Sequence, residues 1–181
     1  MFNPLQVFFS LPQWQRRLAW LGLIVVVGVA LGLWQPYTPA RQPAPATVFT
    51  SIEGTLTDLK ALTGKPVIVT FWATDCHSCV EEIPDLIDLY QDYHAQGLEM
   101  IAVAMFHDIP SHVVEMTQLK QIPYTVALDV DAKHANAFGR IFATPTTFLI
   151  GPDNTIVKQI IGKIKPDLVR QWLDNVKIRV H

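Results

Sequence analysis

The chain has 181 residues, enough for one packed domain and an additional segment. Its net charge is −2, but no acidic residue precedes Glu53, and the 11 basic and 16 acidic residues of positions 47–181 give that part a charge of −5. Nucleic-acid binding needs a basic face. The composition therefore argues against a nucleic-acid partner.

The first predicted element is the uncharged apolar run at residues 18–34, LAWLGLIVVVGVALGLW. As a helix it would be roughly 25 Å long at about 1.5 Å per residue, which is short but sufficient for a membrane span. Arg16 and Arg17 precede it directly, and positive residues favour the cytoplasmic side. We therefore expect a cytoplasmic segment at 1–17, a single transmembrane signal-anchor at 18–34, and a C-terminal domain in the periplasm or its extracytoplasmic equivalent, at a bacterial cell membrane.

Two alternatives to a retained anchor stay open. The run is apolar enough for a helix buried in a protein core, although a proline-rich segment follows it. It also suits a cleaved signal peptide, because residues 44–46, Ala-Pro-Ala, resemble a small-x-small cleavage site. That site lies far beyond the run, which is longer than the about 7 to 15 apolar residues of a signal peptide. A retained anchor is the preferred interpretation.

Residues 35–46, QPYTPARQPAPA, contain four prolines and no apolar periodicity. This composition is typical of an extended, semi-rigid spacer. We expect the spacer to lead into one domain at residues 47–181.

The predicted elements of this domain alternate between strands and helices. Apolar runs predict buried strands, and apolar spacing of three and four residues predicts helices. In chain order these are strand 66–72, helix 81–97, strand 98–106, helix 109–122, strand 124–129, helix 131–139, strands 146–150 and 155–161, and a helix from Pro166. Val113, Met116 and Leu119 are expected on one side of the second helix. The order predicts an α/β fold whose parallel core gains antiparallel strands from a C-terminal hairpin around residues 151–154.

The stretch FWATDCHSC, residues 71–79, contains both cysteines of the chain, Cys76 and Cys79. It joins a predicted buried strand to a helix, and functional sites gather beyond the carboxyl ends of parallel strands. The free N–H groups at a helix N-terminus stabilise a thiolate, and the thiolate is the nucleophilic form of cysteine. The position favours a redox-active pair.

The pair has three other interpretations. A structural disulfide closing so short a loop would stabilise the fold by only about 2 kcal/mol. A zinc or copper site would need further ligands, and the candidates His77, His107, His112 and His134 show no paired spacing. Two free core cysteines would be unusual beside the polar residues between them.

Several motifs together resemble one family. FWATDCHSC followed by VEEIP, then ATPTTFLIGPDNTIV and a final amphipathic helix, are similar to the membrane-anchored thioredoxin-like proteins of bacteria of the TlpA and ResA kind, which include DsbE-like cytochrome c-maturation proteins and ScsD-like proteins. The resemblance covers about residues 47–181. It implies a thioredoxin-like fold, with a mixed sheet and helices on both faces, and a thiol-disulfide oxidoreductase without a metal or any cofactor beyond the Cys76–Cys79 disulfide.

The resemblance also assigns roles to single residues. Cys76, the more exposed thiol, would form a mixed disulfide with the partner, and Cys79 would resolve it. Thr144-Pro145 matches a cis-proline loop that faces the cysteines, presents backbone to a substrate strand and keeps metal ions away. Glu82 matches an acidic position that would move protons to or from Cys79. A solvated first-turn carboxylate is an equally supported alternative for Glu82.

The sequence departs from the family at two positions. Asp75 stands where the family usually has tryptophan, and Thr70 stands where many thioredoxins have a buried acid. We expect Asp75 to cap the following helix rather than to act in catalysis, and Trp72 to pack beneath the motif. Asp75 disfavours the Cys76 thiolate and a protonated His77 favours it, each by about 0.3 to 1 kcal/mol.

The partners implied by the resemblance are protein disulfides or dithiols and a membrane protein that donates or accepts electrons. A reductant, as in cytochrome c maturation, is the preferred role. An oxidase or isomerase is the next, and a metal-binding or copper-tolerance module is the non-enzymatic alternative. The direction of electron transfer depends on the redox potential of the cysteine pair. The residues between the cysteines, His77 and Ser78, do not reveal that potential.

Overall fold

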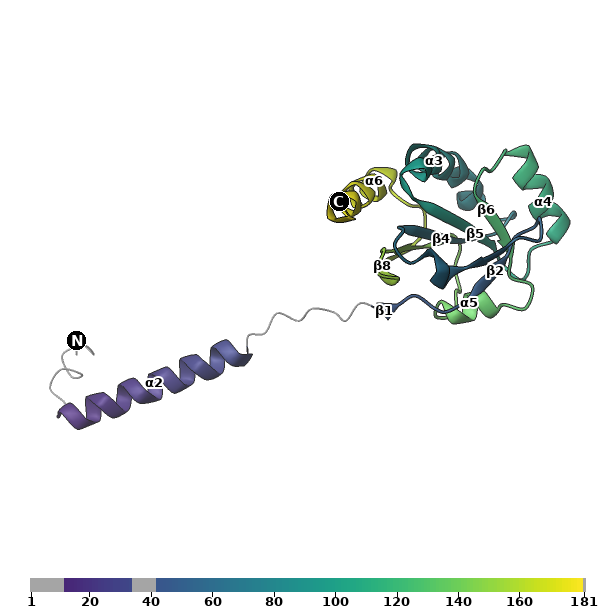
Figure 1. The fold of residues 1–181 in the computed structure, drawn as a ribbon. Helices are drawn as coiled ribbons and strands as arrows, with labels where there is room; N and C mark the ends of the chain where they lie inside the picture. Colours follow the sequence, from purple (N-terminus) through teal and green to yellow (C-terminus); the bar gives the residue numbers. More distant parts are fainter. Residues whose placement is uncertain (1–11, 34–41, 181) are drawn as a thin grey trace, which may run out of the picture. The chain divides into compact units, whose positions relative to one another are not determined.

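The computed structural model describes residues 12–33 and 42–180, which belong to two separate units (Figure 1). The first unit contains helix α2 (Gln13–Leu33). Over the described residues, no helix combines the length and the apolar character that crossing a membrane requires. Most of the predicted cytoplasmic segment 1–17 and of the predicted spacer 35–46 lies outside the described residues.

The second unit is built on a mixed six-stranded sheet with the strand order β1-β8-β7-β4-β5-β6. Strands β4, β5 and β6 are parallel, whereas β7 runs antiparallel to both β4 and β8. The strands span β1 (Gln42–Pro43), β4 (Val67–Trp72), β5 (Glu99–Ala104), β6 (Thr125–Leu128), β7 (Thr146–Ile150) and β8 (Thr155–Ile161). The predicted α/β fold with a parallel core and a C-terminal hairpin is confirmed.

Helices cover both faces of this sheet (Figure 1). They are α3 (His77–Tyr93), α4 (Pro110–Leu119), α5 (Lys133–Ala137) and α6 (Pro166–Val180), with 3-10 turns at Leu59–Leu62 and His94–Gln96. Side chains alternate between the faces of a strand, so β4 sends Ile68 into the core beneath α3 and α6, and Phe71 into the opposite core, which α5 covers. This explains why β4 is apolar at almost every position.

The region before β4 contains elements that the sequence did not predict. Strands β2 (Val48–Thr50) and β3 (Leu56–Asp58) form a two-stranded antiparallel sheet. Phe49 of β2 is fully buried, and its ring stacks on His134 at a centroid distance of 4.5 Å. The unit also begins earlier than predicted, because Gln42 pairs with Ile156 and the Ala44 N–H donates to the Asn154 carbonyl at 2.9 Å. Residues 42–46 therefore belong to the folded unit and not to the spacer.

Two helix predictions need correction. The helix after the cysteines ends at Tyr93, and a 3-10 turn closed by Gly97 in the left-handed conformation (φ 101°) follows it. Leu119 was expected on the packed side of its helix, but 73% of its surface is exposed. It is the last residue of α4, and Val113 is the fully buried residue of that helix.

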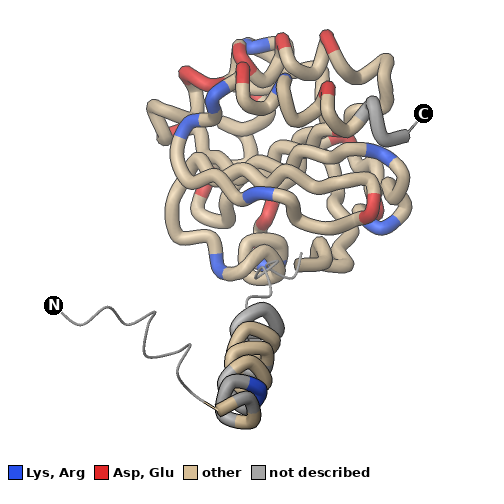
Figure 2. The backbone as a smooth tube through the Cα atoms, turned by 90° about the vertical axis from the view of Figure 1, so that its left-hand side faces the viewer, with Lys and Arg blue, Asp and Glu red and all other residues tan. Residues whose placement is uncertain are grey.

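Acidic and basic residues both occur over most of the second unit. Figure 2 shows the Lys and Arg positions of the described residues interspersed with acidic ones along the backbone tube.

Candidate active site

The two cysteines lie at the junction of β4 and α3, at the carboxyl end of β4, which is in the middle of the sheet. They form a disulfide with a Cα–Cα distance of 5.2 Å. Cys76 is the N-cap of α3, since its Sγ accepts a hydrogen bond from the Cys79 N–H at 3.2 Å. Cys79 is only 2% exposed, whereas Cys76 is partly exposed. The sulfur nearer to solvent is thus also the one held by a backbone donor of the helix.

The capping role predicted for Asp75 is wrong, because Cys76 occupies the N-cap. Asp75 is exposed and lies one residue before the helix boundary. The carboxylate that orders this loop belongs to Asp108, which follows β5. It accepts hydrogen bonds from the Thr74 N–H at 2.6 Å, the Thr74 hydroxyl at 2.7 Å and the Ile109 N–H at 2.8 Å. Asp108 therefore ties the loop before Cys76 to the end of the neighbouring strand.

Sequence reasoning did not find Asp108. Its position after a predicted parallel strand was the available signal, because the carboxyl ends of parallel strands share one edge of the sheet. The hydrogen bonds to Thr74 span 34 positions of the chain, so no local pattern reveals them.

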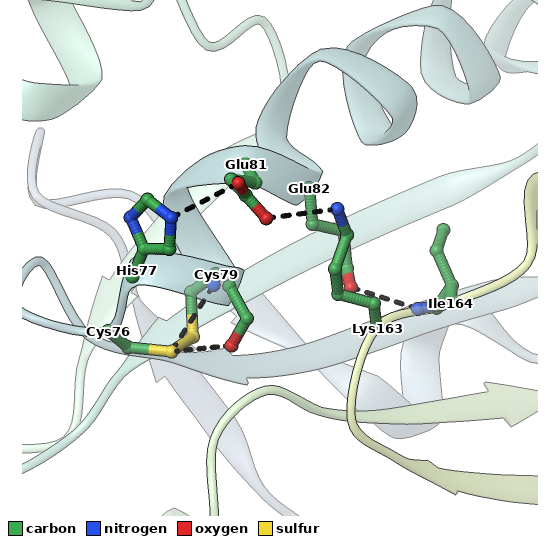
Figure 3. A network of polar contacts seen from close by, with 8 residues as sticks. Cys76, His77, Cys79, Glu81, Glu82, Lys163 and Ile164 are labelled. Carbon is green, nitrogen blue, oxygen red and sulfur yellow. Dashed lines mark hydrogen bonds and ion pairs between the residues drawn. A yellow bond between two sulfur atoms is a disulfide. The ribbon is translucent and has the colours of Figure 1, made fainter.

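Glu82 is buried, with 1% of its surface exposed, and the solvated alternative is wrong. Its Oε2 accepts a hydrogen bond from the Ile164 N–H at 2.9 Å (Figure 3). Burial raises the pKa of Glu82 from 4.5 to about 7, even though the Ile164 N–H and the charge of Lys163 act in the opposite direction. The carboxyl therefore changes protonation near neutral pH, as a proton-transfer group must.

Glu82 and Cys79 line the same small cavity. Its volume is about 10 Å³, close to the space that one water molecule requires. Trp72 and Pro145 also line it, and the Trp72 Nε1 is a buried donor without a hydrogen-bond partner among the described residues. Trp72 thus packs beneath the motif as expected, and it lines the same cavity as Glu82 and Cys79.

The loop before β7 completes the cavity. The Thr144–Pro145 peptide bond is cis, as the resemblance implies. Pro145 is buried and its carbonyl accepts a hydrogen bond from the Gly162 N–H at 2.8 Å, while Thr144 is partly exposed. The loops before β7 and after β8 therefore meet beside the disulfide.

Exposed charged residues extend from the motif along α3. The His77 Nε2 lies 3.1 Å from Glu81, and the other oxygen of Glu81 lies 3.3 Å from the Lys163 Nζ (Figure 3). The Ser78 hydroxyl lies 3.5 Å from the Cys76 Sγ. His77 is 89% exposed, so a charge on its ring would be well screened and would influence the sulfur only weakly.

The histidines considered as metal ligands have other surroundings. His134 is buried, with its Nδ1 2.8 Å from the Thr47 hydroxyl, and burial lowers its pKa. His107 and His112 are exposed. Within residues 12–33 and 42–180, no three His, Cys, Asp or Glu side chains gather as a metal site requires.

Comparison with known proteins places this arrangement in a family. A family model described as Redoxin matches residues 39–176. The chain belongs to the redoxin family. It is similar to the thiol-disulfide oxidoreductase ResA of Bacillus anthracis, with 35% identity over 134 residues that cover 74% of this chain and 76% of the relative. ResA of Bacillus subtilis is 29% identical over 136 residues, 74% of each chain.

A solved structure supports the fold. The thioredoxin-family thiol:disulfide interchange protein of Chlorobium tepidum superposes with a TM-score of 0.70 at 23% identity, over 77% of this chain and 99% of that one. With the ResA relatives, the family makes this redoxin a thiol-disulfide oxidoreductase whose redox pair is Cys76–Cys79.

Proposed function

We propose that this redoxin is a reductant of disulfides in exported proteins, such as those handled in cytochrome c maturation, and that it works without a cofactor other than its own cysteine pair. The observation that carries the proposal is the arrangement of a partly exposed Cys76 in front of a buried Cys79 that shares a cavity with Glu82. Cys76 is placed to form a mixed disulfide with the partner, and Cys79 is placed to resolve it.

The reduced protein would react in two steps. The Cys76 thiolate attacks one sulfur of the partner disulfide, and the other partner sulfur leaves as a thiolate that takes up a proton. The Cys79 thiol then loses its proton, attacks Cys76 and releases the second partner thiol. The partner gains two electrons and two protons, and the Cys76–Cys79 disulfide forms.

Glu82 is the proposed acceptor of the Cys79 proton. A thiol is a poor nucleophile until it ionises, and Cys79 is too buried for bulk water to take the proton efficiently. The cavity that both side chains line gives the proton a short path. A carboxyl with a pKa of about 7 is ionised in a substantial fraction of molecules at neutral pH and regains its proton easily.

The direction of electron flow is tested by the equilibrium potential of the Cys76–Cys79 couple in glutathione redox buffers. If the protein is a reductant, the potential of its couple should be lower than that of protein disulfide isomerase, about −180 mV, and close to that of thioredoxin, about −270 mV. A value near the about −120 mV of a strong oxidase would contradict the reductant role while leaving thiol-disulfide exchange intact.

We also propose that residues 18–34 tether the redox domain to the outer side of a bacterial cell membrane, where a membrane protein renews its electrons. The uncharged run and the preceding Arg16 and Arg17 support this proposal. The full chain should stay in the membrane fraction after alkaline carbonate washing, and the domain should be digested by protease added to spheroplasts. Release of a protein that begins near residue 47 would contradict the tether and favour a cleaved signal peptide.

A further inference from the structure

A groove of about 640 Å³ lies between strand β8 and helix α6, which Figure 1 shows on the same side of the second unit. We call it the β8–α6 groove. Its lining includes every residue of β8 from Val157 to Ile161 and one side of α6, with Leu168 and Trp172. The oxidoreductase chemistry does not use this surface. Part of its lining belongs to the core, because Leu149 and Val169 are buried there and Ile160 and Trp172 pack against the same cluster.

Among the described residues, part of the strand that borders the groove has a free edge. Strand β7 pairs with β8 on one side, whereas β1 pairs on the other side with Thr155 and Ile156 alone. From Val157 to Ile161, no strand of the described residues covers that second side. These five residues extend roughly 16 Å at about 3.3 Å per residue, and a free edge presents backbone donors and acceptors to an additional strand.

The groove has a chemical character that differs from the rest of the domain. Val157, Ile161 and Leu168 are 41%, 57% and 50% exposed. The charged residues that line the groove are all basic, namely Lys158, Lys163 and Lys165, although positions 47–181 carry a net charge of −5. The surface is thus apolar and positive within an acidic domain.

Two of these lysines form no ion pair with the acidic residues that the structure describes. Lys163 is close to Glu81, but neither Lys158 nor Lys165 lies within ion-pair distance of a carboxylate among the described residues. Lys158 and Ile160 are two positions apart and share a face of β8, and Ile160 packs against the core cluster that contains Val169 of α6. Lys158 is therefore on the face of the strand that α6 covers.

The groove also leads to the active site. Strand β8 ends at Ile161, which pairs with Thr146, the residue after the cis-proline. The next residues hold the redox site, since Gly162 donates to the Pro145 carbonyl and Ile164 donates to Glu82. A chain bound along β8 would emerge at the end of the sheet where the cis-proline loop lies, and that loop lines the same cavity as Cys79.

We propose that the β8–α6 groove binds an extended acidic segment of a protein that exchanges disulfides with Cys76. The segment adds as a strand to the free edge of β8, its apolar side chains cover Val157 and Ile161, and its carboxylates meet Lys158 and Lys165. Main-chain hydrogen bonds supply affinity in this mode, and alternate side chains supply specificity. The proposal rests on the proposed function only in taking the segment to belong to an exchange partner.

The direct test measures binding of a fluorescent ten-residue peptide, in which glutamate alternates with valine, to the full-length oxidised protein in detergent micelles. We expect saturable binding that weakens with added salt, because the charges are exposed. A peptide with lysine in place of glutamate, and a glutamate peptide methylated at alternate backbone nitrogens, should not bind. Amide hydrogen exchange at residues 157–161 should slow when the glutamate peptide is present.

Protein variants identify the surface. Lys158→Glu combined with Lys165→Glu should weaken peptide binding by at least about tenfold. The matched control reverses two exposed lysines outside the groove, Lys60→Glu with Lys120→Glu, and should bind as the unaltered protein does. Equal loss in both pairs, or no loss in the groove pair, would overturn the proposal. So would amides at 157–161 that are already protected without peptide, or self-association of the protein through this edge.

Disulfide chemistry is measured separately, so that the two proposals can fail independently. The groove variants should reduce glutathione disulfide at the unaltered rate, but should reduce the glutamate peptide joined to a cystine more slowly than the unaltered protein does. Peptide binding without any exchange at Cys76 would contradict the proposed function alone. Normal exchange without peptide binding, or equal rates on the cystine peptide, would contradict the groove proposal alone.

Discussion

At the scale of single residues, the decisive feature is a carboxyl group that the fold keeps out of water. Glu82 is 1% exposed and its pKa is raised to about 7, mainly by burial. A carboxyl so placed costs stability when it ionises. A buried group with a strongly shifted pKa that lowers the stability of the fold is typical of a functional site.

The pH dependence of stability tests this burial. The folded state keeps the Glu82 proton up to about pH 7, whereas the unfolded chain loses it near the ordinary value of 4.5. The contribution of Glu82 to the free energy of unfolding therefore falls as pH rises from about 4.5 through 7. In the oxidised protein, Glu82→Gln should remove this fall and raise the free energy of unfolding at pH 8 by about 3 kcal/mol.

Urea denaturation of both proteins at pH 4 and pH 8 measures the effect. Glu81→Gln is the matched control, because Glu81 is the adjacent carboxylate and is exposed. It should show no comparable gain. A Glu82→Gln difference that is the same at both pH values would indicate a packing effect and not a titration.

At the scale of elements, the site depends on how β4 is joined to α3. The strand ends at Trp72, the helix begins at His77, and Asp108 holds the loop between them from the next strand. The helix N-terminus supplies the N–H that bonds to the Cys76 sulfur. The end of β4, the hydrogen bonds of Asp108 and the N-terminus of α3 thus together position the Cys76 sulfur.

Two aspartate variants separate the observed loop structure from the predicted one. Asp108→Ala removes the acceptor for three hydrogen bonds and should lower the free energy of unfolding by about 1 to 3 kcal/mol. Asp75→Ala should change it by less than about 0.5 kcal/mol, because exposed residues away from special contacts rarely matter more. Thermal or urea unfolding measures both. A loss of about 1 kcal/mol or more in Asp75→Ala would restore the helix-cap interpretation.

The elements that the sequence predicted well are those with long apolar patterns. β4 is a continuous β-branched and aromatic run, and the β7–β8 hairpin is marked by the turn at residues 151–154. β2 and β3 are only three residues long and mostly exposed, so their pattern is too short to show a period. The hydrogen bond that Glu82 accepts from the Ile164 N–H spans 82 positions, and no local sequence pattern predicts it. At the site, too, the features that the sequence did not predict, such as the hydrogen bonds of Asp108 to Thr74, depend on contacts between distant positions of the chain.

At the scale of the whole molecule, the sheet extends further towards the N-terminus than composition suggests. The proline-rich composition predicted a spacer up to residue 46, yet β1 pairs with β8 at residues 42 and 43. Proline is compatible with an edge strand, so spacer composition and strand pairing coexist there. The same short pairing leaves the rest of the β8 edge uncovered among the described residues.

Truncation tests this boundary. A chain that begins at residue 42 should fold with a higher free energy of unfolding than one that begins at residue 47, by about 1 to 3 kcal/mol. The shorter chain loses the β1 pairing, the hydrogen bond from Ala44 to Asn154 and the burial of the Ala44 side chain. Equal denaturation midpoints would show that residues 42–46 behave as a spacer after all.

Mixed-disulfide trapping tests the central claim, that Cys76 exchanges disulfides and Cys79 resolves them, most directly. Cells would express the full chain as Cys79→Ser or, as a control, as Cys76→Ser, and intermolecular disulfides in the cell envelope would be identified by mass spectrometry. We predict that Cys79→Ser accumulates partner proteins bonded to Cys76 and that Cys76→Ser does not. Equal capture by both variants, or no capture above the control, would contradict the account.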